Sequence, residues 1–479
     1  MLFHSLAFFG FFPLVVLATF LVPARHRWAV LLVASYIFYG AWQPAYLLLI
    51  VASTAVDYLA GLKLGAATGK GRRWWLGVSL AVNLGLLVSF KYLGFLSQSL
   101  ETGLGWAGVE AHFPSLELLL PVGISFYTFQ TLSYTIDVYR GEREPERHLG
   151  CFALYVSFFP QLVAGPIERS TTLLPQLVRG FTFDRGRCIS GLGLMLWGFF
   201  KKVVVADRAA KIVDAVYGHP GGFQGVTIWL ATYAFAIQIY GDFSGYSDIA
   251  IGAARVLGID LSENFRRPYA ASSPADFWRR WHVTLSMWFR DYVYIPLGGS
   301  RVTLSRHLFN LMVVFVLSGL WHGASWTFVL WGGYHGALLV AGVLWGRLAE
   351  REGGAPRQGA AMHTLRVVGT FHLVCLGWLI FRANDLTHLG ELLLRLPVSY
   401  PRSIGAELGA ALPGTHLGLE LWVLGVSALA LAIVEAVRAR ALRLPTPAPP
   451  VRGLAWAALC VWVLLAATQS HSPFIYFQF

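Results

Sequence analysis

Two histidines in this sequence have surroundings in which an imidazole could act as a base. His322 lies in Ser318-Gly-Leu-Trp-His-Gly323, inside an apolar stretch from Leu308 to Trp345. Ionisable side chains within membrane segments cost about 2.5 to 3.5 kcal/mol at mid-helix, so those found there are functional candidates. A neutral imidazole could remove the proton of a hydroxyl group, and small neighbours would let a substrate approach the ring. His322 is therefore the first catalytic candidate, and a structural core histidine is an equally supported alternative.

The second histidine, His282, directly follows Trp278-Arg-Arg-Trp281, where the hydropathy falls. Aromatic belts with snorkelling arginines are typical of membrane boundaries, and the residues alone favour that structural interpretation. A third histidine, His335, lies 13 residues after His322. On a helix that turns about 100° per residue it would point well away from His322, so we do not expect it in the same pocket.

Two carboxylates, Asp242 and Asp248, lie with two glycines in the otherwise apolar segment 240–248. Buried carboxylates need partners, and Tyr246 and Ser244 each lie four residues from one of them, so local hydrogen bonds are feasible. A structural polar network between helices explains this segment at least as well as direct catalysis.

The elements that would position these groups are membrane helices. The chain has 479 residues, of which 56% are hydrophobic and 13% are charged, whereas soluble domains are about 45–50% apolar and about 25% charged. Apolar runs of about 20 residues recur along the chain, and each could cross the hydrocarbon core. We therefore predict an all-α, polytopic integral membrane protein with about 10 to 13 membrane segments and shorter re-entrant pieces.

The net charge of +12 comes largely from short basic loops such as Lys70 to Arg73. Basic loops between apolar segments follow the positive-inside rule. The charge therefore indicates a lipid bilayer as the partner of this surface, and not a nucleic acid.

A single membrane domain is expected over 1–479, with N-terminal helices in 1–140, a core in 150–346 and C-terminal helices in 367–479. Prolines, glycines and charges interrupt the hydropathy of the core. Irregular backbone at membrane depth survives only where it is buried in protein or lines a wet cavity. The core should therefore hold the site, and Glu168 within it is interpreted as a helix-entry residue and not as a reactive acid.

Several motifs are missing. The four cysteines form no CxxC pair, and the sequence contains no HExxH, complete P-loop, dinucleotide fingerprint or in-register GxSxG. These patterns would signal a metal site, a nucleotide or a covalent nucleophile. We therefore expect no metal site, no bound cofactor and no covalent serine or cysteine chemistry.

The ordered motifs resemble the membrane-bound O-acyltransferase superfamily, over nearly the whole chain. Within it, they are most similar to the branch of alginate O-acetylation proteins, with teichoic acid D-alanyl-transfer proteins as near cousins. The motifs that carry the resemblance are Pro121-Val-Gly-Ile-Ser-Phe-Tyr127, Phe159-Pro-Gln-Leu-Val-Ala-Gly-Pro166, Tyr240-Gly-Asp-Phe-Ser-Gly-Tyr-Ser-Asp248, Phe265-Arg-Arg-Pro-Tyr269, Phe277-Trp-Arg-Arg-Trp-His282, Ser286-Met-Trp-Phe-Arg-Asp-Tyr292, Ile295-Pro-Leu-Gly-Gly299 and Ser318-Gly-Leu-Trp-His-Gly323.

This resemblance implies a ring of helices around a central tunnel, with His322 as the hallmark catalytic histidine and His282, the second motif histidine, as a further catalytic residue. The donor would be a cytosolic acyl thioester, either acetyl-CoA or an acyl carrier. Acetyl is the favoured acyl group. The acceptor would be a hydroxyl of an exported polysaccharide, reached directly or through an extracytoplasmic relay protein, at the bacterial inner membrane. The remaining substrate-binding candidates are Asp242, Tyr246, Ser318, Trp321, Arg279 and Arg280.

Two alternatives stay open at this point. D-alanyl transfer uses the same core motifs, so the motifs do not separate it from acetyl transfer. A proton-coupled transporter could use Asp242, Asp248 and His322 as a proton relay, and inverted internal repeats, which are not evident in the sequence, would favour it.

Overall fold

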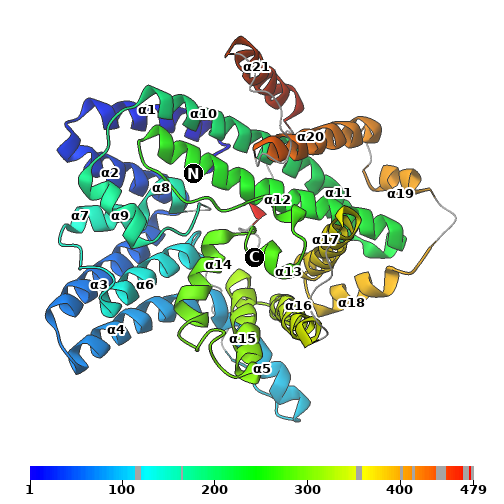
Figure 1. Ribbon diagram of the computed structural model, residues 1–479, viewed down its shortest axis with the longest axis horizontal. Helices are drawn as coiled ribbons and strands as arrows, with labels where there is room; N and C mark the ends of the chain where they lie inside the picture. The colour runs from blue at the N-terminus through cyan, green and yellow to red at the C-terminus, as the bar shows by residue number, and fades with distance from the viewer. Residues whose placement is uncertain are drawn as a thin grey trace. The chain divides into compact units, whose positions relative to one another are not determined.

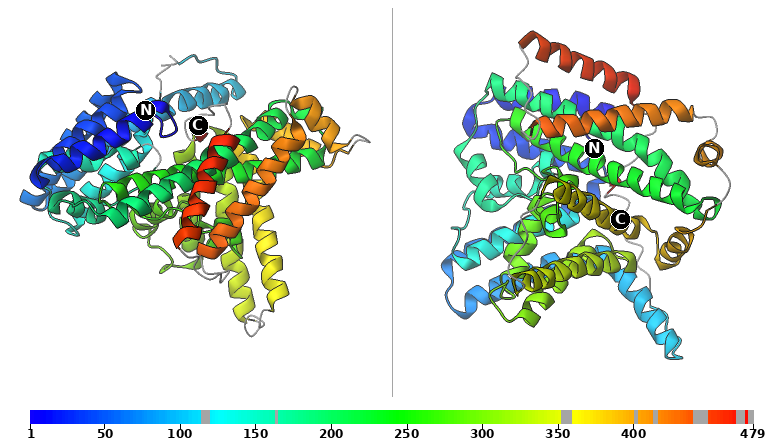
Figure 2. Two further views of the ribbon diagram at one scale, coloured as in Figure 1. Left: turned by 90° about the horizontal axis from the view of Figure 1, so that it is seen from above. Right: turned by 45° about the vertical axis from the view of Figure 1, so that its right-hand side comes forward.

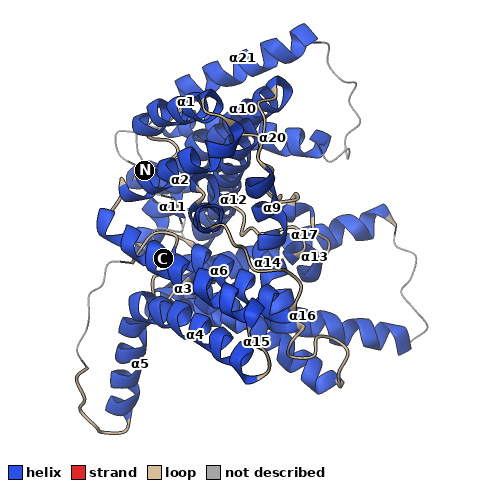
Figure 3. Cartoon of the chain, turned by 90° about the vertical axis from the view of Figure 1, so that its left-hand side faces the viewer, coloured by secondary structure: helices blue, strands red, loops and turns tan. Residues whose placement is uncertain are grey.

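The structure is a computed structural model that describes residues 1–113, 120–162, 165–351, 359–399, 403–412, 416–438, 449–467 and 474–475. Helices, blue in Figure 3, and their connecting loops make up this described part, which contains no strand. The all-α prediction is confirmed. The chain forms two compact units: unit 1 is Met1–Met195 with Ile249–Ser262, and unit 2 is Leu196–Asp248 with Glu263–Phe479.

The helices of unit 1 come mainly from the N-terminal third of the chain. They are α1 (Leu6–Leu21), α2 (Arg27–Gly40), α3 (Leu47–Ala66), α4 (Lys70–Leu87), α5 (Leu93–Trp106), α6 (Ile124–Arg140), α7 (Leu149–Ser157), α8 (Phe159–Leu162), α9 (Ser170–Arg179) and most of α10 (Arg185–Phe199), with short helical turns η1 (Ala24–His26), η2 (Pro44–Tyr46) and η3 (Val88–Tyr92).

Unit 2 contains the later helices and all of the predicted catalytic and substrate-binding residues. Its elements are η4 (Phe200–Ala206), α11 (Asp207–Gly218), η5 (Pro220–Gly222), most of α12 (Gly225–Val256), η6 (Pro268–Ala270), α13 (Pro274–Trp278), α14 (Val283–Phe289), η7 (Arg290–Tyr294), α15 (Leu304–His322), α16 (Trp326–Arg351), α17 (Ala360–Arg382), α18 (Leu386–Arg395), α19 (Ile404–Ala411), α20 (Leu417–Arg438) and α21 (Pro449–Ala466). The unit boundary falls inside α10 and α12, and the predicted single-domain organisation stays a prediction.

Within the described residues, seven helical segments are long and apolar enough to cross a membrane. They are Pro44–Ala66, Lys70–Trp106, Arg185–Gly218, Leu304–His322, Trp326–Glu350, Ala360–Arg382 and Leu417–Arg438, and shorter apolar helices cover Leu6–Leu21, Leu149–Leu162 and Gly453–Ala466. The chain is therefore a multi-pass membrane protein. The shorter helices are needed to approach the number of segments expected from the sequence.

A buried carboxylate joins three helices of unit 1. Helices α3, α4 and α6 lie side by side in Figure 1. Asp57 on α3 accepts hydrogen bonds from Ser79 and Asn83 on α4 (Asn83 Nδ2 at 2.8 Å) and from Thr135 on α6 (3.1 Å). These hydroxyl and amide groups supply the hydrogen bonds that the buried carboxylate needs and that lipid could not supply.

Glycines let α15 and α16 of unit 2 pack backbone against backbone. A Cβ at Gly319 would lie 2.2 Å from the carbonyl oxygen of Phe328, and one at Gly332 would lie 2.3 Å from that of Phe315. Small residues at helix interfaces allow such close approach in membranes. This contact holds the C-terminal end of α15, where His322 lies, against α16; the two helices can be followed side by side in Figures 1 and 2.

Two neighbouring glycines on α16 test this packing. Gly332→Ala adds a methyl group that meets the Phe315 carbonyl oxygen at 2.3 Å, whereas Gly333→Ala adds one with nothing within 4 Å. Because backbone cannot move aside as a side chain can, we expect Gly332→Ala to lower the unfolding temperature of the purified protein in detergent by several degrees. Gly333→Ala should leave it almost unchanged. Equal effects of the two variants would contradict close packing at Gly332.

Candidate active site

His322 is the last residue of α15, and its ring is enclosed by aromatic side chains. Gly323 follows in an extended conformation (φ −162°), and α16 begins three residues later at Trp326. The imidazole is only 3% exposed. The rings of Trp321, Trp331 and Phe381 meet it edge to face, with centroids 5.0, 4.9 and 5.5 Å away. His322 therefore lies among apolar rings, in surroundings of low dielectric constant that strengthen any hydrogen bond its ring makes.

Trp321 lies against both candidate histidines. Its ring centroid is 5.9 Å from that of His282 and 5.0 Å from that of His322, and each pair is edge to face. The structure thus brings His322, His282 and Trp321 into one cluster. Only the family resemblance predicted that they lie together, because the residues around His282 favoured a place at the membrane boundary.

The backbone at His282 has an unusual conformation. His282 lies between α13 and α14 with φ 43° and ψ 55°, in the left-handed region that few residues other than glycine adopt. Hydrogen bonds on both sides hold it: Arg266 N donates to Arg280 O (2.9 Å), and Val283 N donates to Asn264 O (3.0 Å). Such backbone strain is concentrated at functional sites, so this conformation favours a functional role for His282.

The His282 ring is fully buried and has a defined polar partner. Its Nδ1 lies 3.1 Å from Oδ1 of Asn264, and the Phe243 ring meets it edge to face at 4.7 Å. His282 lies outside the candidate membrane spans, and burial lowers its pKa to about 3. The ring is therefore neutral at physiological pH, so it can exchange hydrogen bonds but cannot supply a positive charge.

The placement of His335 corrects an argument made from the sequence. The spacing of 13 residues separates His322 from His335 in the expected way only on one continuous helix, but α15 ends at His322 and His335 lies on α16. One tryptophan contacts both: Trp331 lies 4.9 Å from each ring. His335 is therefore a neighbour of the aromatic cluster, because the apolar run conceals a helix break at residues 323–325.

The two arginines before His282 lie at the surface. Arg279 is paired with Asp276 at 3.5 Å and its side chain is 71% exposed, and Arg280 is paired with the same carboxylate at 3.0 Å and is 34% exposed. Burial alone would raise the pKa of Asp276, but the hydrogen bond and charge of Arg280 lower it overall. Both guanidinium groups are thus held by a carboxylate that stays ionised, in a place that a polar ligand could reach.

The other substrate-binding candidates are buried. Ser318 lies one turn before His322 on α15 and on the same helix face. Tyr246 on α12 is 1% exposed and packs against Phe474 at 4.4 Å. Asp242, also on α12, is occupied by an ion pair, described next. The proposed substrate contacts of these residues stay predictions.

A buried ion network explains the carboxylates of α12. The π-helical turn η4 carries Lys201, whose Nζ is 2.7 Å from Asp248, and Lys202, whose Nζ is 2.9 Å from Asp242 and 2.8 Å from Asp207. Charges in such surroundings require partners, because the desolvation cost is large. The carboxylates are therefore paired with lysines, partners that the local spacing of Tyr246 and Ser244 did not indicate.

Sequence reasoning missed these lysines although the signal was present. Adjacent lysines interrupt an apolar stretch, and an ionisable residue in a membrane span implies a partner. Glycines make the pairing possible: a Cβ at Gly245 would lie 2.8 Å from Gly198 O, and one at Gly241 would lie 3.0 Å from Lys201 O. The alternation of Gly and Asp in this motif therefore builds a close, charged contact between α12 and η4, on which α20 and α21, orange and red in Figure 2, also pack.

The C-terminal segment reaches the same network. The backbone N–H of Ile475 donates to Asp242 Oδ2 at 2.7 Å, and the Phe474 ring lies 5.8 Å from that of Phe243. Because Phe243 also contacts His282, Phe474 lies one aromatic ring away from the candidate site.

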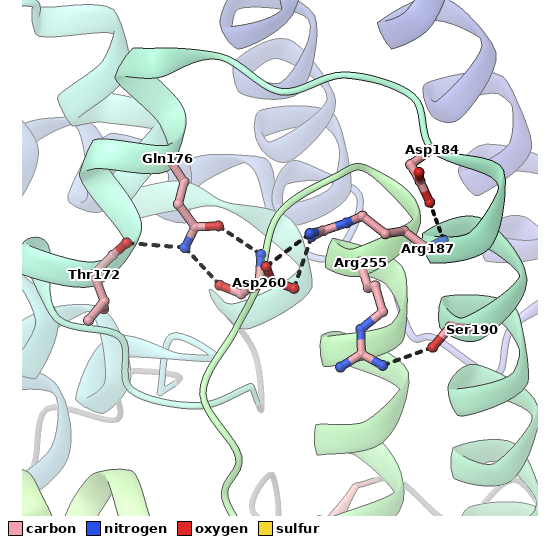
Figure 4. A network of polar contacts seen from close by, with 7 residues as sticks. All are labelled: Thr172, Gln176, Asp184, Arg187, Ser190, Arg255 and Asp260. Carbon is pink, nitrogen blue, oxygen red and sulfur yellow. Dashed lines mark hydrogen bonds and ion pairs between the residues drawn. The ribbon is translucent and has the colours of Figure 1, made fainter.

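In unit 1, a polar network fixes the segment that leads to Asn264. Gln176 on α9 pairs with the backbone of Asp260, accepting from its N–H at 2.9 Å and donating to its C=O at 3.0 Å, and Arg187 binds its carboxylate at 2.9 Å (Figure 4). Glu168 accepts from the N–H and hydroxyl of Ser262. Burial raises the pKa of Glu168, and these hydrogen bonds oppose that shift. Glu168 thus precedes α9 and ties down a loop, in agreement with its interpretation as a helix-entry residue.

These features define a polytopic membrane protein with two buried histidines linked by one tryptophan, beside two arginines at the surface. Comparison with known proteins identifies the family. The model of the membrane-bound O-acyltransferase family matches residues 148–353, the part of the chain that contains both histidines.

Three relatives are similar over most of their own length. The chain is 38% identical to the probable alginate O-acetylase AlgI of Pseudomonas putida over 100% of both chains. It is 36% identical to the peptidoglycan O-acetyltransferase of Helicobacter pylori over 79% of this chain and 76% of that protein. It is 27% identical to the teichoic acid D-alanyltransferase of Bacillus subtilis over 58% of this chain and 73% of that protein. The chain belongs to the membrane-bound O-acyltransferase family and is an O-acyltransferase.

The ion network allows a matched pair of substitutions. Lys202→Met removes a cation whose side chain is 1% exposed and takes the bound ammonium group away from two buried carboxylates, whereas Lys211→Met removes one that is 30% exposed and bound to Glu420. Breaking a buried pair costs about 3–5 kcal/mol, and an exposed pair contributes about 0–1 kcal/mol. We expect Lys202→Met to cause a large loss of folded protein in detergent, measured by size exclusion and thermal unfolding, and Lys211→Met a small one. A Lys202→Met variant as stable as the parent would show that the network does not support the fold.

Proposed function

We propose that this protein transfers an acetyl group from a cytosolic thioester to a hydroxyl group of an exported polysaccharide, with His322 as the general base. The observation that carries the proposal is the position of His322: a buried imidazole at the end of α15, enclosed by three aromatic rings and one tryptophan away from His282.

The proposed reaction needs one proton acceptor at the acceptor hydroxyl. As the hydroxyl oxygen attacks the thioester carbonyl carbon, His322 takes the hydroxyl proton, the C–S bond breaks, and the proton passes to the departing thiolate. General-base assistance of this kind contributes about 10² to 10⁴ in rate. The surrounding rings would keep water from the thioester, so that hydrolysis does not compete with transfer.

His282 and the arginines have separate roles in this proposal. The neutral His282 ring exchanges a hydrogen bond with a substrate group near Trp321. Arg279 and Arg280, which are exposed and oriented by Asp276, bind phosphate oxygens of the donor, whether acetyl-CoA or an acyl carrier. Asp242, Tyr246 and Ser318 shape the surroundings of the two histidines.

The acceptor is inferred from what the similar proteins are named for. Two of the relatives are O-acetyl-transferring proteins for alginate and peptidoglycan, both of them polysaccharides, and one matches over 100% of both chains. This supports polysaccharide O-acetylation at the bacterial inner membrane. The acyl group would reach the polymer directly or through an extracytoplasmic relay protein.

D-alanyl transfer is the second candidate, because a teichoic acid D-alanyltransferase is also similar. Purified protein in proteoliposomes would be supplied with radiolabelled acetyl-CoA or with a D-alanyl carrier-protein thioester. Acetyl transfer to a polysaccharide supports the proposal, and transfer of D-alanine alone would replace it. A transporter would instead move substrate without forming an ester, and the family membership favours acyl transfer.

The base assignment predicts a specific loss of chemistry. His322→Ala should reduce acetyl transfer by at least about 10², while the protein still inserts and elutes as a folded species. The control is His335→Phe on α16, another buried histidine beside Trp331, which should change the rate only a few-fold. Acetyl transfer retained by His322→Ala would rule out the assigned role.

The aromatic enclosure predicts selectivity for a short acyl group. Phe381→Leu removes ring atoms from the edge contact with His322, so propionyl transfer should rise relative to acetyl transfer by about tenfold, the effect of one methylene in an apolar site. Phe371→Leu, on the same helix but against Tyr233, Tyr269 and His372, is the control and should leave the ratio unchanged. The measurement is kcat/KM for the two donors in parallel. An unchanged ratio in Phe381→Leu would show that Phe381 does not limit acyl size.

A further inference from the structure

We infer that Asn264 is a positioning residue that holds the neutral His282 ring in the tautomer with the proton on Nδ1 and the lone pair on Nε2. The catalytic consequence of this inference rests on the proposed function, whereas the tautomer itself is independent of it.

The hydrogen bonds identify the atom of Asn264 that faces His282. Oδ1 of Asn264 lies 3.2 Å from the backbone N of Thr284, 3.0 Å from its hydroxyl and 3.1 Å from Nδ1 of His282. A backbone N–H can only donate, so the Asn264 atom that it meets is the carbonyl oxygen and not the amino group. Because that oxygen can only accept, Nδ1 of His282 must carry the proton.

The same residue also fixes the backbone around the ring. Asn264 O accepts from Val283 N at 3.0 Å, directly after His282, so both oxygens of this 1% exposed residue hold the turn. The faces and edges of the imidazole meet Phe243 at 4.7 Å, Trp321 at 5.9 Å and Phe265 at 6.5 Å. A ring rotation that exchanges the two nitrogens would require these aromatic neighbours to move.

Since the ring is neutral, its tautomer decides what it can do. Free neutral histidine in water favours the opposite tautomer, with the proton on Nε2, so the protein must impose the form that Asn264 selects. With the proton on Nδ1, the Nε2 atom accepts a hydrogen bond and cannot donate one. His282 can therefore hold a substrate hydroxyl or amide N–H, but it cannot stabilise an oxyanion through Nε2.

The test is the ¹⁵N spectrum of the histidine-labelled full chain in lipid nanodiscs, with the His282 signals assigned by their loss in His282→Gln. The parent protein should show a protonated Nδ1 and an unprotonated Nε2 at neutral pH. Asn264→Ala should move the His282 signals toward the Nε2–H form. Thr284→Val removes one donor to the same oxygen but keeps the bond to His282, so it is the matched control and should retain the parent spectrum.

Several outcomes would overturn the inference. An Nε2–H signal for His282 in the parent protein would do so without any variant, even if Asn264→Ala does not fold. An unchanged His282 spectrum in a folded Asn264→Ala, with the other histidine signals in place, would do so as well. Asn264→Asp keeps an oxygen acceptor at this position and should therefore retain the Nδ1–H form.

Acetyl transfer measured on the same samples separates this inference from the proposed function. We expect Asn264→Ala to lower transfer about tenfold or more and Asn264→Asp to restore part of the loss. If the tautomer shifts in Asn264→Ala while transfer is unchanged, the tautomer assignment is confirmed. The proposed hydrogen bond between His282 and the substrate is then wrong.

Discussion

The ion pairs that join η4 to α11 and α12 are the interaction on which the rest of unit 2 depends. Charged groups in surroundings of low dielectric are tolerated only when each has a partner, and Lys201 and Lys202 find theirs in Asp248, Asp242 and Asp207. These pairs fix α12, which carries Phe243 against His282. The same carboxylate, Asp242, also receives the backbone N–H of Ile475, so the C-terminal segment is held through the same charges.

Around this frame the site is built mainly from aromatic contacts and backbone hydrogen bonds. Trp321 and Trp331 link three histidines by edge-to-face contacts, and glycines at the α15–α16 interface allow the two helices to meet closely enough for these contacts to form. The ion pairs and the aromatic rings of unit 2 thus contribute to the site in different ways. The ion pairs hold the helices, and the rings set the environment in which a neutral imidazole can act.

Sequence reasoning predicted the helical membrane architecture because long apolar runs have few other stable solutions. It also selected His322, an ionisable residue in such a run. It misplaced His335, because a break of three residues, 323–325, does not interrupt the apolar composition. It did not find Asn264, whose importance comes from a turn that pairs residues 264–266 with 280–283 and has no periodic signature. Lys201 and Lys202 could have been found by searching the apolar segments for a cation to pair with Asp242 and Asp248.

The left-handed backbone at His282, with a second instance at Arg267, has a consequence for how this segment evolves. Each costs about 1 to 3 kcal/mol, and glycine would relieve most of it. Natural selection for thermal robustness alone would therefore drive both positions toward glycine. An imidazole and a guanidinium at these two positions therefore lower the stability of the turn relative to glycine, a cost of the kind that proteins accept at functional sites.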